Sequence, residues 1–218
     1  MRYVSWAVLY EGPSDALYLD ILLPRTIRDL IAAEGVALVE IPDAPTVRLG
    51  RHGRATDTVA DEACSAREAF DMVFIHADTG GRHVERGLGD RSTAYCTAVN
   101  ERCDWPVDRC VIISPRHETE AWLLADDAAV AGALGYRGAP AAIGLPSDAR
   151  TADQLPDPKQ VLASAITAVA GRRRSQRIDI VFPAIAQRQE LSRLRRSPSF
   201  QTFEERLRVC LRALGHIK

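Results

Sequence analysis

Apolar runs and polar breaks alternate along the first part of the chain. Residues 3–10 form a compact, β-favouring apolar run, and the turn-forming residues 12–15 interrupt it, with Ser14 as the expected helix cap. Apolar positions then recur at helical spacing over residues 17–35, which end in glycine and contain Pro24, where we expect a kink. The pattern therefore predicts a strand, a turn and a long helix.

The same alternation continues to residue 113. Further strands are expected at residues 36–41, 72–75 and 109–113, further helices at 58–70 and 91–103, and a polar, glycine-rich loop at 48–58. This order of elements is typical of an α/β fold in which helices flank a mainly parallel, four-stranded sheet.

Helical spacing dominates the rest of the chain. A helix is expected to begin near Glu118, whereas residues 135–157 are rich in Gly, Pro, Ala and Asp and predict a linker with a turn or two of helix. A helix over residues 158–169 follows, and the last stretch is expected to be helical and divided by Pro183 and Pro198.

These elements divide the chain into three parts. We expect an α/β domain over residues 1–134, a linker over 135–157 and a basic helical annex over 158–218 that packs on the first domain. The net charge of −1 excludes a bulk polycation, but residues 172–218 contain twelve basic and four acidic side chains and therefore carry +8. The annex is thus the predicted contact region for an anionic partner.

Arginine supplies nearly all of the positive charge, since only Lys159 and Lys218 are lysines. The planar guanidinium binds phosphate in a bidentate manner, and contacts of this kind make binding sensitive to salt. The residues predicted to hold nucleic-acid phosphates are Arg172, Arg173, Arg174, Arg193, Arg195 and Arg196. The alternatives are a solvated helix face and a GC-rich genome, which also favours arginine.

Cysteine number and hydropathy bear on the compartment. Five cysteines without a C-x-x-C pair argue against a zinc knuckle and against a disulfide framework, and they fit a reduced cytoplasm. The first apolar run is interrupted too early for a signal peptide, and no stretch of about 18 apolar residues occurs. We therefore expect a soluble, cytoplasmic protein that does not contact a membrane.

Acidic residues end three of the apolar runs, at Glu11, at Asp78 and at the pair Glu118 and Glu120. The carboxyl ends of parallel strands gather along one edge of a sheet, so these side chains are expected to converge there. Converging carboxylates suit Mg²⁺ or Mn²⁺ together with a substrate phosphate. Glu11, Asp78 and Glu120 are the predicted catalytic residues, and these three with Glu118 are the predicted metal ligands.

Each of these acids also has a simpler interpretation. Residues 11–15 read equally as a turn with a capping residue, and the acids near residue 120 as complements to a helix dipole. Glu118 and Glu120 are two apart at a helix start, so they are expected to point in different directions, with Glu118 closer to solvent. Supporting or substrate-contacting roles are predicted for Gly12, Asp15, His76, Arg116 and His117, although His76 is more often a packed histidine at such a position.

Three motifs resemble those of Toprim domains, the α/β modules of topoisomerases, primases and nucleases of the overcoming-lysogenization-defect class. They are Glu11-Gly12-Pro13-Ser14-Asp15, Ile75-His76-Ala77-Asp78 and the stretch 119–126, Thr-Glu-Ala-Trp-Leu-Leu-Ala-Asp. The tail over residues 191–214, with Pro198-Ser199-Phe200 before an amphipathic helix, is similar to the end of a bacterial Toprim-like family whose genes often lie beside an ABC-type ATPase. P-loop, dinucleotide-binding, zincin and α/β-hydrolase motifs are missing from the sequence.

The resemblance implies that Glu11 is a general acid or base and that Asp78 and an acidic partner hold Mg²⁺ for cutting or joining a phosphodiester. One position departs from the family pattern, because Gly80 stands where the Asp-x-Asp motif has its second carboxylate. In the other register Asp78 is second and His76 occupies the first position. Either Glu118 or Glu120 replaces the missing ligand, or metal affinity and catalysis are weakened or lost.

Three hypotheses about function follow. The first is a Mg²⁺-dependent nuclease acting on DNA or RNA, an effector of a phage-defence or toxin system with an ATPase partner. The second is a catalytically silent interaction module on the Toprim scaffold that docks on an ABC-type ATPase. The third is a phosphotransferase or phosphatase of a small nucleotide, which needs the same acids and a deeper pocket. The sequence leaves a homodimer open.

Overall fold

A computed structural model describes residues 2–50, 55–78, 92–170 and 178–218 of the chain. Its central sheet has four parallel strands in the order β4 (Val47–Arg48), β2 (Trp6–Leu9), β5 (Met72–His76) and β6 (Cys110–Ile113). The chain runs from β2 outward to β4 and then crosses to β5 on the other side of β2. The connections therefore reverse direction between β2 and β5, which is where open α/β sheets bind ligands. The predicted α/β class with a parallel, four-stranded sheet is confirmed.

Two of the predicted strands differ from the observed ones. The first apolar run is divided, because β1 (Arg2–Tyr3) leaves the main sheet and pairs with β3 (Val39–Glu40) in a separate, two-stranded sheet. The main sheet instead takes β4 from the segment predicted to open a loop, held by hydrogen bonds from Thr46 N to Trp6 O and from Leu49 N to Val8 O, both 2.9 Å. A short edge strand of this kind has too few residues to show a pattern.

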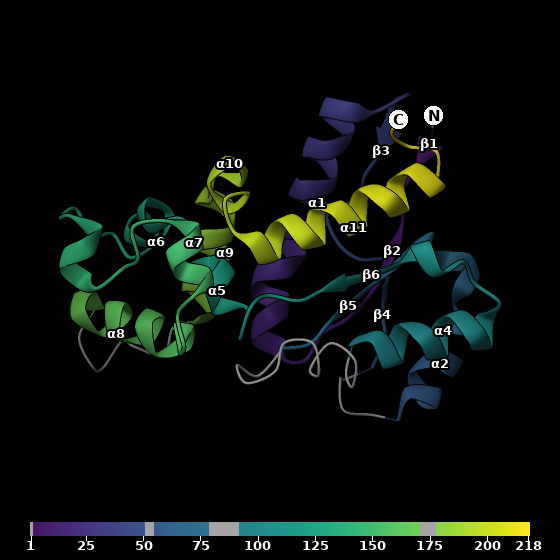
Figure 1. Cartoon of the computed structure of the whole chain (residues 1–218), viewed down its shortest axis with the longest axis horizontal. Helices are drawn as coiled ribbons and strands as arrows, with labels where there is room; N and C mark the ends of the chain where they lie inside the picture. The colour runs from purple at the N-terminus through teal and green to yellow at the C-terminus, as the bar shows by residue number, and fades with distance from the viewer. Residues whose placement is uncertain (1, 51–54, 79–91, 171–177) are drawn as a thin grey trace.

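One face of the sheet is covered by α1 (Pro13–Glu34) and α11 (Pro198–Ala213), and the opposite face by α2 (Thr56–Ser65) and α4 (Ala94–Cys103), as Figure 1 shows. Alternate residues of each strand supply the two cores, since successive strand side chains point to opposite faces. Trp6, Val8, Met72 and Phe74 pack in the first core, and Ala7, Leu9, Val73 and Ile75 in the second.

Short helices form a lobe that packs beside the sheet (Figure 1). Its elements are α5 (Glu120–Leu123), α6 (Asp127–Ala133), the 3-10 turn η4 (Pro140–Ile143), α7 (Ala149–Asp153), α8 (Pro158–Ala170), α9 (Ile178–Arg188) and α10 (Leu191–Leu194). Tyr18 of α1 donates a 2.6 Å hydrogen bond to Gln189 after α9, and Arg25 of α1 donates one of 2.7 Å to the carbonyl of Gln189. The lobe is therefore tied to the long helix under the sheet.

The segment 135–157, predicted to be a linker, is packed into the lobe. It contains η4 and α7, and Ile143, Leu145, Ala149 and Ala152 are buried in the same core that covers the α1 face of the sheet. Gly, Pro and Ala are small enough to fit between other elements, so composition did not reveal this burial. The predicted boundaries between domain, linker and annex stay a prediction.

Several helix ends agree with the sequence patterns, and others correct them. α1 stops at Gly35, α8 starts at Pro158, and α11 starts at Pro198 after its cap Ser197, as expected. Residues 56–65 form α2, after which a 3-10 turn, η1 (Arg67–Ala69), leads to β5, and a second one, η3 (Val107–Arg109), leads to β6.

The cap of α1 differs from the expected one. The N-cap is Gly12, whose N–H donates 2.8 Å to the carboxylate of Asp15, so Ser14 is inside the helix and is not the cap. This bond is the half of a capping box in which the side chain three residues after the cap accepts the N–H of the cap residue. Pro183 lies within α9 and does not divide it.

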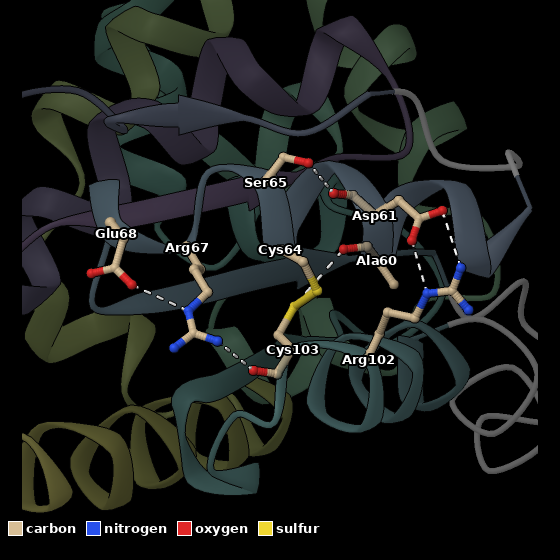
Figure 2. Close-up of a disulfide and its surroundings, with 8 residues drawn as sticks. All are labelled: Ala60, Asp61, Cys64, Ser65, Arg67, Glu68, Arg102 and Cys103. Atoms are coloured by element: carbon tan, nitrogen blue, oxygen red, sulfur yellow. Dashed lines mark hydrogen bonds and ion pairs between the residues drawn. A yellow bond between two sulfur atoms is a disulfide. The ribbon is translucent and has the colours of Figure 1, made fainter.

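Two disulfides contradict the expectation that no disulfide framework forms. Cys64 of α2 is bonded to Cys103 at the end of α4, and Cys96 of α4 is bonded to Cys110 of β6. Figure 2 shows the first bond between the two helices, beside the ion pair of Arg102 with Asp61. The odd count arises because Cys210 stays free and buried against Met72. Spacing gave no signal, since the partners are 39 and 14 residues apart and meet only when α2, α4 and β6 pack.

The compartment expected from the cysteines is not supported by this pairing, because disulfides are rare in a reducing cytosol. The cytoplasmic assignment stays a prediction. No helix within the described part of the chain is long and apolar enough to span a bilayer.

Candidate active site at the carboxyl edge of the sheet

Two predicted acids meet at the point where the strand connections reverse. Glu11 follows β2, and Asp78 follows β5 on the adjacent strand. The backbone N–H of Asp78 donates a hydrogen bond of 2.6 Å to Oε2 of Glu11. This bond joins the ends of the two central strands, so the predicted convergence of these two residues is observed.

Asp15 and His76 form a buried layer beside these acids. His76 ends β5 and shares the strand face of Met72 and Phe74, so its ring points toward α1, where Asp15 lies in the first turn. Nδ1 of His76 is 3.5 Å from Oδ2 of Asp15, and Nε2 is 3.5 Å from Oδ1 of Asp78. His76 is therefore both packed and part of the acidic site.

Thr119 connects this layer to the segment after β6. Its hydroxyl donates 2.9 Å to Oδ1 of Asp15 and lies 3.0 Å from Nε2 of His76. The hydroxyl has one proton, so with that proton given to Asp15 the histidine must be the donor in the second contact. Burial lowers the pKa of His76 and so favours a neutral ring, whereas the charges of Asp15 and Glu11 oppose this shift. Nδ1, which faces Asp15, has no hydrogen-bond partner among the described residues.

The charges of Glu118 and Glu120 both act on Asp78, and the expectation that their side chains point in different directions stays a prediction. α5 starts at Glu120, so Glu118 lies before the helix, in a turn where His117 has a φ of 69°. Helical spacing therefore does not set the direction of Glu118. Glu120 is buried, with 7% of its surface exposed, and Glu118 is half-buried, which agrees with the expectation that Glu118 is nearer to solvent. Oε2 of Glu118 is buried and lacks a hydrogen-bond partner within the described part of the chain.

Burial, together with the neighbouring acids, makes it unfavourable for Asp78 to ionise. Burial raises the pKa of Asp78 to about 8, and the charges of Asp15, Glu11, Glu120 and Glu118 add to this effect. Burial also raises the pKa of Glu120, against a backbone hydrogen bond and the positive charge of Lys159. A cation in the cluster would favour the ionised forms of all these acids.

The donor atoms that are close enough to share an ion come from Asp15, His76 and Asp78. In the described part of the chain these three offer ligand atoms within 4.8 Å of one another, and Glu11, Glu118 and Glu120 are not in this group. Two carboxylates and one imidazole suit Mn²⁺ or another transition metal better than Mg²⁺, which prefers oxygen ligands. Nδ1 of His76, which has no hydrogen-bond partner among the described residues, also fits such a donor set.

The other predicted site residues contribute less. Gly12 has an extended φ of −140°, and a Cβ there would make ordinary contacts, so the backbone does not require glycine. Arg116 is exposed next to the turn, and His117 is half-buried within it. Sequence reasoning did not assign a role to Thr119, which holds Asp15 and His76 in place, nor to Arg48 at the end of β4.

The annex arginines are only partly available to an external phosphate. Arg193 pairs with Asp127 at 2.9 Å and with Asp126 at 3.3 Å, and Arg195 pairs with Asp29 and Glu204. These internal pairs do not support the predicted phosphate contacts of the two residues. Arg196 is exposed, which is compatible with such a role. The cluster predicted at Arg172, Arg173 and Arg174 lies outside the described residues, as does Gly80.

Comparisons of this chain with protein-family models, with curated proteins and with solved structures gave no match.

Proposed function

We propose that the protein is a divalent-metal-dependent phosphodiesterase of the Toprim type that acts on DNA or RNA. The observation that carries this proposal is the junction of Glu11 and Asp78 over the buried pair Asp15 and His76, at the reversal point of a parallel sheet. A buried acid with a raised pKa, such as Asp78 in a group of acids at one sheet edge, is typical of functional sites.

The chain's own residues suggest a division of roles. Asp15, His76 and Asp78 would hold the ion, and a divalent ion there would neutralise phosphate charge and promote ionisation of a water. Glu11 accepts the N–H of Asp78, which fixes its carboxylate beside the ligands, and we assign it as the general base that receives a proton from the attacking water. Thr119 holds Asp15 and His76 in their relative orientation.

Metal binding is tested first, by thermal unfolding with increasing Mn²⁺ or Mg²⁺. We expect the melting temperature to rise with the concentration of Mn²⁺ more than of Mg²⁺, because the ion binds only the folded state. The Asp78→Asn variant is expected to lose this response, whereas Glu40→Gln on exposed β3 keeps it. A wild-type melting temperature that no divalent ion changes contradicts the proposal.

Cleavage is tested with plasmid, single-stranded DNA and single-stranded RNA in the presence of Mn²⁺. Glu11→Gln is expected to lower the cleavage rate by about 10²-fold or more, the usual size of a general-base contribution. The same Glu40→Gln variant is the control for an exposed glutamate elsewhere. Equal inactivity of wild type and Glu11→Gln on every substrate contradicts the assignment.

A catalytically silent interaction module is the second candidate, and one observation favours it. Thr119 contacts both Asp15 and His76, so it joins α1, β5 and the segment before α5 without an ion. Docking on an ABC-type ATPase, and a part in phage defence, follow only from the Toprim resemblance. Stable binding of such an ATPase by a chain that neither binds metal nor cleaves nucleic acid would support this function.

A further inference from the structure

A cavity of about 300 Å³ opens next to Glu11, between the carboxyl ends of β2 and β4. Its walls are mainly apolar and come from Val8, Pro13, Ala16 and Leu49. Glu11 and Arg48 supply its two charges. The cavity is therefore adjacent to the candidate site but is not formed by the proposed metal ligands.

The backbone that forms one wall is held on two sides. Leu49 donates its N–H to the carbonyl of Val8 at 2.9 Å, and Gly50 donates its N–H to the carboxylate of Glu62 at 2.9 Å. These bonds attach the end of β4 to β2 and to α2. The cavity wall is thus part of the folded scaffold, and its shape does not depend on a ligand.

Arg48 is oriented by a neighbouring acid but retains most of its donors. Its Nη2 donates 2.5 Å to Oδ2 of Asp20, and the other oxygen of Asp20 accepts 3.0 Å from the hydroxyl of Tyr10. A guanidinium has five N–H donors, and the contacts made by Arg48 within the described chain use one of them. The side chain is 51% exposed, so the remaining donors are accessible to a ligand.

We propose that this cavity binds one phosphorylated nucleotide unit of the substrate, with the phosphate at Arg48 and the base or sugar against the apolar walls. The proposal rests on the proposed function, because it places a substrate phosphate beside Glu11. Guanidinium groups bind phosphate oxygens through charged, directional hydrogen bonds. The volume is at the low end for ligand cavities, which suits a single nucleotide and excludes a duplex.

The test measures binding without catalysis, by isothermal titration of adenosine 5′-phosphate in the presence of EDTA. Adenosine and inorganic phosphate are titrated in parallel. We expect saturable binding of the nucleotide and weaker binding of both fragments, because the cavity contacts both parts. Arg48→Gln is expected to weaken nucleotide binding by about tenfold or more, the usual effect of losing a charged hydrogen bond.

Two further variants make the result specific. Ala16→Leu fills the cavity from α1 without changing charge and is expected to abolish binding. Arg67→Gln is the matched control, since Arg67 is also 51% exposed and paired with an acid, Glu68, but precedes β5 at the opposite edge of the sheet. Its affinity for the nucleotide is expected to equal that of wild type. Thermal unfolding of each variant verifies that it is folded. If Arg48→Gln is unfolded, the nucleotide affinity of Ala16→Leu provides the test.

Three results would overturn the proposal: no saturable binding at millimolar nucleotide, equal affinity for inorganic phosphate, or wild-type affinity in both Arg48→Gln and Ala16→Leu. The failure of the proposed function gives a different result. If the protein binds the nucleotide through Arg48 but cleaves no nucleic acid, the nucleotide site is supported and the phosphodiesterase function is contradicted. If Arg48→Gln cleaves nucleic acid with an unchanged KM, the phosphodiesterase function is supported and the nucleotide site is contradicted.

Discussion

The two faces of the central sheet are stabilised in different ways. The face under α1 and α11 belongs to a large core in which the Trp122 ring packs edge-on against Phe200, with centroids 5.1 Å apart, and at a tilted angle against Phe203, with centroids 5.4 Å apart. The face under α2 and α4 has a smaller core, and both disulfides lie there, the bond between Cys64 and Cys103 being the one drawn in Figure 2. The comparison indicates that covalent links on the second face compensate for its smaller apolar core.

The candidate site belongs to the first of these faces. Asp15 comes from α1, His76 points toward α1, and Thr119 comes from the segment that leads into the lobe. We therefore expect the site to depend on the aromatic core and to be insensitive to the disulfides.

Truncation of the aromatic core is expected to have the largest effect. Trp122→Ala removes a fully buried ring and the 2.7 Å hydrogen bond from its Nε1 to Ser199. The free energy of unfolding, measured by urea denaturation, is expected to fall by about 3–5 kcal/mol. Val209→Ala in α11 is the control, because Val209 is 44% exposed, and it is expected to change the free energy of unfolding by less than about 0.5 kcal/mol. A loss for Trp122→Ala as small as that of the control would contradict the division between the faces.

Removal of the link between α2 and α4 is expected to come next. The double variant Cys64→Ser with Cys103→Ser opens a loop with a sequence separation of 39 and is expected to lower the free energy of unfolding by about 2–4 kcal/mol. The melting response to Mn²⁺ should remain, because the site lies on the other face. A reducing agent should lower the melting temperature of wild type but not further lower that of the double variant. A wild type that does not respond to reduction has no such bond.

Removal of the second disulfide is expected to have a smaller effect. Cys96 and Cys110 are separated by 14 residues, and a shorter loop restricts the unfolded chain less. The double serine variant is expected to lose about 1 kcal/mol less than the Cys64 and Cys103 variant in the same denaturation experiment. The reverse order would show that native packing, and not loop entropy, sets the contribution of each bond.

The pH response of the acidic cluster is expected to be the smallest of the four. The pKa of Asp78 is about 8 in the folded protein and about 4 in an unfolded chain. The raised value means that the proton binds the folded state more tightly. Stability from this group is therefore complete below about pH 4 and is lost as pH rises through 8.

Thermal unfolding of metal-free protein over this pH window measures the effect. A shift of this size corresponds to at most about 5 kcal/mol, and we expect a measured loss on the order of 1 kcal/mol because solvent screens the 29%-exposed side chain. Asp78→Asn should show a smaller loss over the same window, and reduction of the disulfides should leave the difference unchanged. Identical pH profiles for wild type and Asp78→Asn would show that the neighbouring acids do not act on Asp78.

Most helices and strands were recognisable before the structure was known because their signals are local. The long helix ending at Gly35 and the strand at Met72–His76 show continuous apolar periodicity or a compact apolar run. The strand at Val47–Arg48 was missed because it has only two residues and is held by hydrogen bonds to β2. The packing of residues 135–157 was missed because small side chains carry little periodic signal.

For the candidate site, local patterns were sufficient to place acids after the strands, since an apolar run followed by Glu11 or Asp78 is visible in the chain itself. Local patterns were not sufficient to identify the residues that form the donor group, because Asp15, His76 and Asp78 become neighbours only when α1 packs on β5. The disulfide partners and the position of Arg48 beside Glu11 could not be predicted for the same reason. Periodicity and turn chemistry act over a few residues, whereas contacts between distant segments depend on how the whole chain packs.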